Sequence, residues 1–134
     1  MAMAIENITM HTNKDCLVVP IQYELSPETV DYLKNKILTT IKTTHVNGVL
    51  IDISGMDIID SSIVCFLTET TQATYLLGVH TVITGFKPGS VSSILDLGLD
   101  LESLHTSITL EKGFQLIDEL RTNRFSDVIN NAIS

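Results

Sequence analysis

The chain has 134 residues, of which 44% are hydrophobic and 18% are charged, and these proportions are typical of one globular domain rather than a disordered chain. Sixteen acidic residues against eight basic ones give a formal net charge of −8, which argues against nucleic acid or an anionic membrane as a partner. No apolar run reaches the roughly 18 to 20 residues of a membrane-spanning helix, and the start shows no signal-peptide pattern, so a cytoplasmic protein is expected.

The first predicted elements form a hairpin. Two short β-like runs, 5–10 and 16–21, flank the polar segment 12–15, and this order is typical of an antiparallel strand pair. The chain has two cysteines, Cys16 and Cys65, far apart and without a CxxC motif. They are predicted to be reduced, buried thiols with no redox role.

An amphipathic helix is predicted to follow the hairpin. Ser26 offers an N-cap hydroxyl, Pro27 suits the first helical position, and Glu28 places an acid in the first turn. The pair Asn47-Gly48 is predicted to end this helix. Its apolar stripe recurs at spacings of three and four residues: Val30, Leu33, Ile37 and Ile41.

A buried strand, a loop and a second helix are predicted in the middle of the chain. Residues 49–53 are nearly all apolar and β-branched, as in a strand covered on both faces. After the loop 54–60, a helix is expected from Ser61 or Ser62 to Leu77, ending at Gly78. Its inward face is expected to carry Ile63, Phe66, Leu67, Thr70 and Leu77.

Strand and helix alternate again in the last third of the chain. A further strand is predicted at 81–84, followed by the turn 85–89 and a short helix that ends at Gly98. An extended piece at 106–109 precedes a last helix with three apolar residues on one side, namely Phe114, Ile117 and Leu120.

The predicted elements define an α/β fold. We expect a small mixed sheet, mostly parallel, with an amino-terminal antiparallel pair, packed against about four helices. One domain is predicted at 1–121, and the weakly patterned segment 122–134 is predicted to be a carboxyl-terminal tail.

The sequence lacks the usual catalytic patterns. The turn 85–89 has neither glycine spacing of a phosphate-binding loop. Ser61 lies outside a GxSxG motif, with no histidine, lysine or arginine close to it in the sequence. The histidines have no metal-ligand spacing and are expected to be surface or capping residues: His11, His45, His80 and His105. A protein without enzymatic activity, cofactor or metal is therefore expected.

The acidic residues Asp52, Asp57 and Asp60 allow a second interpretation. Carboxylates after a parallel strand accept phosphate or bind magnesium in receiver domains, with Asp57 as the acceptor here. Such a domain also needs an acidic pair after its first buried strand, which this sequence lacks. A helix N-cap at Asp60 and a solvated acid at Asp57 are therefore favoured.

The segment 49–63, VLIDISGMDIIDSSI, strongly resembles the core motif of STAS domains, the sulphate-transporter and anti-sigma-factor-antagonist family. The segments 85–91 and 94–101 are similar to the turn, third helix and Leu-Gly segment of the same family, and the resemblance spans about residues 5–120. In that family, a partner kinase phosphorylates the serine at the helix start. The resemblance implies Ser61 as this serine, with Ser62 as the weaker candidate.

The branch of the family follows from the residues after the two serines. Anti-sigma-factor antagonists usually continue with Gly-Leu, whereas this chain has Ile63-Val64 and is closer to the stressosome scaffold branch, called RsbS. Ser62 stands where that branch has a bulky residue. RsbR-like members of the family are larger because they carry a separate amino-terminal sensor domain. They are expected to be partners of this chain.

The resemblance implies a scaffold that holds a serine/threonine switch kinase until Ser61 is phosphorylated, in a homo-oligomer with RsbR-like paralogues. The implied partner-binding residues are Asp57, Ile58, Ile59, Asp60, Ser61 and Ser62. A free anti-sigma-factor antagonist is the alternative within the family, and a receiver-like phosphotransfer domain is the alternative outside it.

Overall fold

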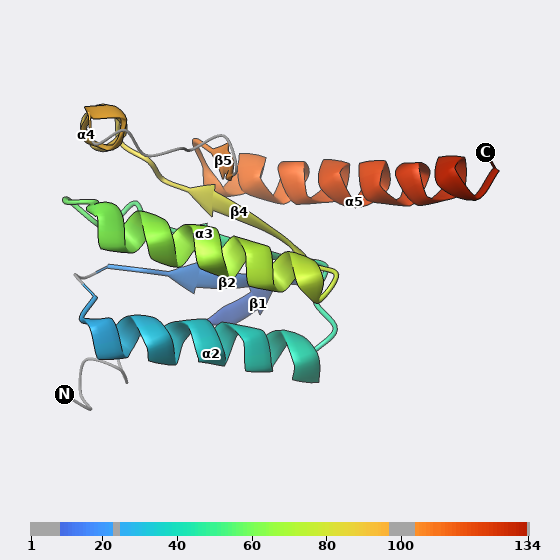
Figure 1. The fold of residues 1–134 in the computed structure, drawn as a ribbon, viewed down its shortest axis with the longest axis horizontal. Helices are drawn as coiled ribbons and strands as arrows, with labels where there is room; N and C mark the ends of the chain where they lie inside the picture. Colours follow the sequence, from blue (N-terminus) through green and yellow to red (C-terminus); the bar gives the residue numbers. More distant parts are fainter. Residues whose placement is uncertain (1–8, 23–24, 97–103, 134) are drawn as a thin grey trace.

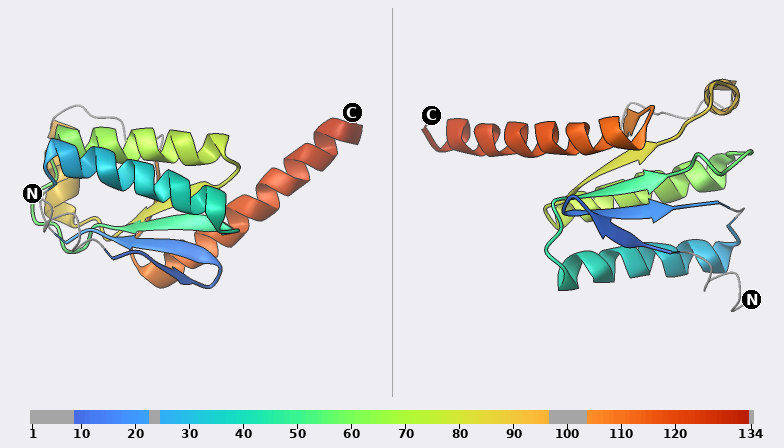
Figure 2. Two further views of the ribbon diagram at one scale, coloured as in Figure 1. Left: turned by 90° about the horizontal axis from the view of Figure 1, so that it is seen from below. Right: turned by 180° about the vertical axis from the view of Figure 1, so that it is seen from behind.

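The computed structural model describes residues 9–22, 25–96 and 104–133. They form one five-stranded sheet in the order β1-β2-β3-β4-β5. Helices α2 and α3 cover one face of the sheet, and α5 crosses the other face (Figures 1 and 2). The mixed, mostly parallel α/β architecture expected from the sequence is confirmed.

The sheet begins with the predicted antiparallel pair, β1 (His11–Asn13) and β2 (Cys16–Pro20). The first strand lies later than the predicted 5–10, and its last two residues belong to the segment 12–15 that was expected to be the turn. Lys14 and Asp15, with φ of 51° and 61°, make the turn with two residues only, because consecutive left-handed conformations match the twist of a hairpin. Residues 5–8 of the predicted strand lie outside the described residues.

The remaining strands run parallel to β2. They are β3 (Gly48–Asp52), β4 (His80–Thr84) and β5 (His105–Ser107). Strand β3 lies in the middle of the sheet, and its apolar residues are buried. All four carboxyl ends of the parallel strands therefore meet at one edge of the sheet, where the connecting loops lie.

Helix α2 (Pro27–Thr43) begins as predicted, with the Ser26 hydroxyl accepting a hydrogen bond from the Thr29 amide at 3.3 Å. It ends earlier than the predicted Asn47-Gly48 stop. Gly48 instead begins β3, where a Cβ atom would lie 2.5 Å from the Ile117 side chain of α5. The glycine is thus explained by helix packing against the sheet.

Helices α3 (Ser61–Leu76) and α4 (Pro88–Asp96) match the predicted helices, although the predicted end of the latter at Gly98 lies outside the described residues. Leu77 does not face inward as expected, because it is the C-cap residue of α3 and is 40% exposed. Thr74 takes the buried position instead, and its hydroxyl lies 2.6 Å from that of Thr81.

The hydrophobic core has two parts, one on each face of the sheet. The larger part joins the sheet to α2 and α3, and the smaller part joins β2, β3 and β4 to α5 (Leu110–Ile133). Cys16 belongs to the smaller part. Cys65, predicted to be buried, is exposed on α3, because it lies between inward positions of that helix.

Helix α5 continues without a break past residue 121, where the sequence predicted a separate tail. Its 24 residues correspond to roughly 36 Å of helix. The carboxyl-terminal half projects beyond the strands (Figures 1 and 2). Across the described parts of the chain, no helix combines the length and hydropathy that a bilayer span requires.

Candidate functional site

Ser61 is the first residue of α3 and lies at the carboxyl edge of the sheet. The loop 53–60 leads to it from β3. Met56 and Ile59 fix this loop, because both side chains are buried in the larger core, whereas Ile58 between them is 65% exposed. Together with the buried Ile53, they anchor the loop at every third residue, and its other residues are exposed to solvent.

Asp60 is the N-cap of α3, as the sequence predicted. Its Oδ1 accepts a hydrogen bond from the Ile63 amide at 3.0 Å, which satisfies one of the unpaired amides at the helix start. Because Asp60 provides the cap, the hydroxyl of Ser61 is not needed for that role. Ser61 and Ser62 are both exposed.

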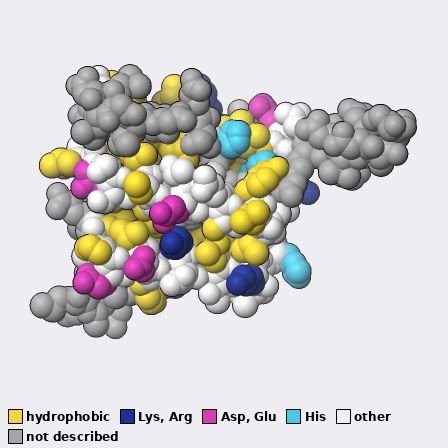
Figure 3. All heavy atoms as spheres, in the orientation of Figure 1, with side chains coloured by type: hydrophobic (Ala, Val, Ile, Leu, Met, Phe, Trp, Pro, Cys, Tyr) yellow, Lys and Arg dark blue, Asp and Glu magenta, His cyan; other side chains and the backbone are white. Residues whose placement is uncertain are grey.

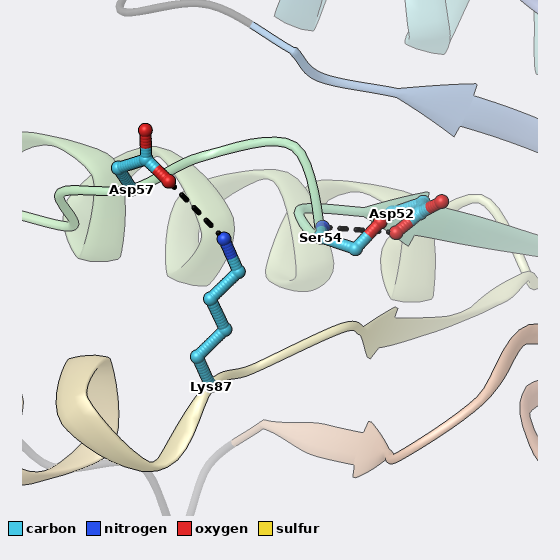
Figure 4. A network of polar contacts seen from close by, with 4 residues as sticks. All are labelled: Asp52, Ser54, Asp57 and Lys87. Atoms are coloured by element: carbon cyan, nitrogen blue, oxygen red, sulfur yellow. Dashed lines mark hydrogen bonds and ion pairs between the residues drawn. The ribbon is translucent and has the colours of Figure 1, made fainter.

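Asp57 forms an ion pair with Lys87, whose Nζ lies 3.2 Å from Oδ1 (Figure 4). The pair joins the loop 53–60 to the turn that follows β4. Both side chains are exposed, by 93% for Asp57 and 47% for Lys87. Asp57 is thus a solvated acid, as favoured by the sequence, but it has a partner that the sequence reasoning did not name.

Lys87 was missed because it lies 30 residues after Asp57 in the chain. The signal was present, since loops that follow neighbouring parallel strands lie at the same edge of the sheet. The sequence places no other lysine or arginine in the loops 21–26, 53–60 and 85–87. Within these three loops, Lys87 is therefore the cation that reduces the negative charge beside Asp57.

The turn at Gly85 packs against the start of the loop 53–60. Gly85 has a φ of 94°, and a Cβ atom at this position would lie 2.6 Å from the backbone nitrogen of Ser54. The Ser54 amide also donates to Asp52 Oδ1 at 3.0 Å (Figure 4). Close backbone contact and a positive φ both require glycine here.

Within the described ranges, histidine, cysteine and acidic side chains are scattered, and no three of them converge as a metal site would require. His80 is partly buried and packs edge to face with Tyr75 and His105, at the opposite edge of the sheet. His11, His45 and His105 are exposed.

Five of the predicted partner-binding residues are brought together as one exposed surface. They are Asp57, Ile58, Asp60, Ser61 and Ser62. Ile59 differs from them, because it is 5% exposed and belongs to the core. Its place is therefore to hold the loop, not to present a surface.

The fold and this edge define a small α/β domain with an exposed serine at the start of a helix, where the preceding aspartate provides the N-cap. The model of the STAS domain family matches residues 7–113. The chain therefore belongs to the STAS domain family.

Comparisons with individual proteins agree on the branch. The chain is 28% identical to RsbT co-antagonist protein RsbRA of Bacillus subtilis over 115 residues, which are 86% of this chain and 39% of that protein. The chain thus spans about two fifths of the length of this curated relative. RsbRD of the same organism is 25% identical over 95 residues, 71% of this chain and 34% of RsbRD.

Solved structures show the same relationship. A serine-to-glutamate variant of Moorella thermoacetica RsbS superposes with a TM-score of 0.74 at 30% identity, covering 85% of this chain and 97% of RsbS. A chain from a structure of the stressosome, described as a signal integration and transduction hub, gives 0.72 at 31% identity, covering 84% and 97%. The sequence-based resemblance to the RsbS-like branch is confirmed.

Proposed function

We propose that this chain is a scaffold of a stressosome-like assembly that binds a serine/threonine switch kinase and releases it when Ser61 is phosphorylated. The observation that carries this proposal is the exposed hydroxyl of Ser61 at the start of α3, whose capping role is taken by Asp60. The chain itself is then a substrate and a binding partner, without turnover of its own, and acts in the cytoplasm.

Phosphate at Ser61 changes the charge of this surface strongly and the fold weakly. The modification adds about −1.5 to −2 charges and three strong acceptors. The dipole of α3 favours an anion at its start by roughly 0.3 to 1 kcal/mol. A carboxylate at roughly 5 Å opposes a doubly charged phosphate by about 1.7 kcal/mol in bulk water. These effects nearly cancel in the free domain.

A docked kinase changes this balance. It excludes water from the exposed loop residues around Ser61, so repulsion between the phosphate and the neighbouring carboxylates is no longer screened. Asp57 and Asp60 are the carboxylates on the same loop. Lys87 forms an ion pair with Asp57 and so reduces the repulsion from that carboxylate. Phosphorylation is therefore expected to release the partner without unfolding the domain.

The relatives support the choice of partners. RsbRA and RsbRD are described as RsbT co-antagonists, and a similar chain was solved as part of a stressosome. We therefore infer a switch kinase of the RsbT kind as the binding partner and RsbR-like, sensor-bearing STAS proteins as neighbours in the assembly. A free anti-sigma-factor antagonist would instead form only small complexes with its kinase, so particle size separates the two functions.

The test uses the purified chain with a cognate kinase and ATP. Fragmentation mass spectrometry is expected to place phosphate on Ser61, and Ser61→Ala should abolish it while keeping the kinase bound. Ser62→Ala is the matched control and should be phosphorylated normally. Phosphate mainly on Ser62, or on Asp57 as an acid-labile acyl phosphate, would contradict the proposal.

A further inference from the structure

A hollow lies at the opposite edge of the sheet from Ser61. It has a volume of about 450 Å³ and is formed by the end of α3 and the starts of β4 and β5. Strand β5 begins opposite Val82, so His80 and Thr81, the first two residues of β4, extend beyond the described part of β5. The hollow is therefore a consequence of strand register, because the shorter strand stops before it reaches the last turn of α3.

Three aromatic rings line this hollow. The ring of His80 packs against both of the others: its centroid lies 5.6 Å from that of Tyr75 and 6.1 Å from that of His105, with interplanar angles of 60° and 79°. These distances and angles are typical of edge-to-face packing. Tyr75 is 50% exposed and His105 is also exposed, so a ligand can reach the rings at both ends of the row.

Apolar side chains are concentrated beside the rings. Leu76, which also lines the hollow, is 86% exposed. Figure 3 shows hydrophobic side chains gathered over the end of α3, beside histidine side chains. Exposed apolar surface of this kind often marks a binding site. The volume also lies within the range of roughly 300 to 1,000 Å³ that is typical of small-molecule sites.

The lining disfavours charged ligands. The other described residues of the lining are two threonines and a glutamine, so no lysine, arginine or carboxylate is among the described lining residues. An ion that entered would lose hydration without gaining an ionic partner. Cations bind best over the faces of Trp, Tyr and Phe, whereas two of the three rings here are imidazoles, which can themselves accept a proton. A neutral ligand is therefore favoured.

The rings indicate the shape and chemistry of this ligand. A planar aromatic ring can stack or pack edge to face against Tyr75 and His105, and it then extends the row of rings. A neutral imidazole offers one hydrogen-bond donor and one acceptor. A ring system that contains nitrogen can pair with these groups, which a purely hydrocarbon ring cannot do.

We propose that this hollow binds a neutral, planar heteroaromatic small molecule of about two fused rings, held by Tyr75, Leu76 and His105. Ser61 and Leu76 are the first and last residues of α3, whose 16 residues correspond to roughly 24 Å of helix. The site is therefore separate from the proposed kinase surface and does not rest on the proposed phosphorylation.

The test compares three probes that share one ring system and differ in charge at neutral pH: indole, which is neutral, indole-3-acetate, an anion, and tryptamine, a cation. Each is titrated into the full chain and followed by heteronuclear NMR. Indole is expected to bind with a Kd below about 1 mM. It should shift the amide signals of residues 71–81 and 104–106 and leave those of 54–62 in place. Indole-3-acetate should bind at least fivefold more weakly, and tryptamine no more tightly than indole.

Matched variants test the contribution of the rings. Tyr75→Leu and His105→Leu each remove one ring and keep an apolar side chain, and each should weaken indole binding at least fivefold. Tyr32, which is 42% exposed, and His45, which is exposed, lie elsewhere on the surface. Tyr32→Leu and His45→Leu are therefore the controls and should bind indole like the wild type. All four variants change exposed residues and should keep the circular dichroism spectrum.

Four results would overturn the proposal. They are the absence of saturable indole binding to the wild type, an equal loss of binding in Tyr75→Leu and Tyr32→Leu, tighter binding of either charged probe than of indole, and indole-induced shifts centred on residues 54–62. A hollow that another protein chain covers in solution would give the first of these results.

Discussion

The two edges of the sheet differ in almost every physical property. At the carboxyl edge, Asp57, Asp60 and Lys87 are exposed around Ser61, and the loop is held by Met56 and Ile59. At the amino edge, the surface is an apolar hollow beside a helix that projects from the domain. Strands of five residues, roughly 17 Å, separate them. A charge added at one edge is therefore expected to leave the other unchanged.

The largest effect is expected from Gly85→Ala at the carboxyl edge. The residue has a positive φ, and the new Cβ would meet the backbone of Ser54 at 2.6 Å, so the free energy of unfolding should fall by about 2 to 4 kcal/mol. Chemical denaturation measures this fall in the free energy of unfolding. Gly89→Ala, where a Cβ meets nothing within 4 Å, is the control and should cost less than about 0.5 kcal/mol.

The amino edge should respond to alkaline pH through Cys16. Burial, with smaller contributions from Asp118 and Asp15 against a lowering by Arg121, raises the pKa of this thiol from 9.0 to about 11. As the pH rises, the Cys16 thiol therefore loses its proton in the unfolded chain first. The free energy of unfolding should be unaffected below pH 9 and should fall by about 2 kcal/mol between pH 9 and 11.

Denaturation at pH 8 and at pH 11 tests this effect. Cys16→Ala removes the thiol, so the free energy of unfolding of this variant should differ little between pH 8 and pH 11, although the variant is less stable at both pH values. Cys65→Ala, which changes the exposed cysteine, should leave the fall unchanged. An equal fall in Cys16→Ala and the wild type would contradict the assignment.

A smaller effect is expected from Asp60→Ala, which removes the cap of α3. The loss should be about 1 kcal/mol, in the usual range for an N-cap. Asp60→Asn keeps an acceptor oxygen and should recover most of it. Ser61→Ala should change the melting temperature very little, and a loss as large as that of Asp60→Ala would make the Ser61 hydroxyl part of the cap.

The smallest effect is expected from Lys87→Met. Its ion pair with Asp57 is exposed, so stability should change by less than about 0.5 kcal/mol. Lys34→Met, which breaks the similar pair with Glu69 at 3.4 Å on the helical face, is the matched control. Of these two variants, only Lys87→Met should slow kinase binding, because Lys87 lies at the carboxyl edge and Lys34 lies on the helical face.

Local sequence signals predicted much of the fold and part of the site. The caps at Ser26 and Asp60 were predictable because each depends on three or four consecutive residues. The alternation of strands and helices followed from periodicity in the same way. Both kinds of signal lie within one element, so no knowledge of the tertiary structure was needed.

Features that depend on tertiary contacts were not predictable in this way. Lys87 reaches Asp57 only because β3 and β4 are neighbours, and Gly48 begins a strand because Ile117 packs on it. The exposure of Cys65 and Leu77 depends on which face of α3 meets the sheet. The hollow at the amino edge is formed by residues from α3, β4 and β5, which no single segment could indicate.

Release of the kinase without unfolding of the domain is tested most directly by native mass spectrometry of the chain mixed with a cognate switch kinase, before and after ATP is added. ATP is expected to place one phosphate on Ser61 of each chain, and the kinase is expected to dissociate from a chain that stays folded. Retention of the kinase by chains phosphorylated on Ser61, or unfolding of the released chain, would contradict the proposed switch.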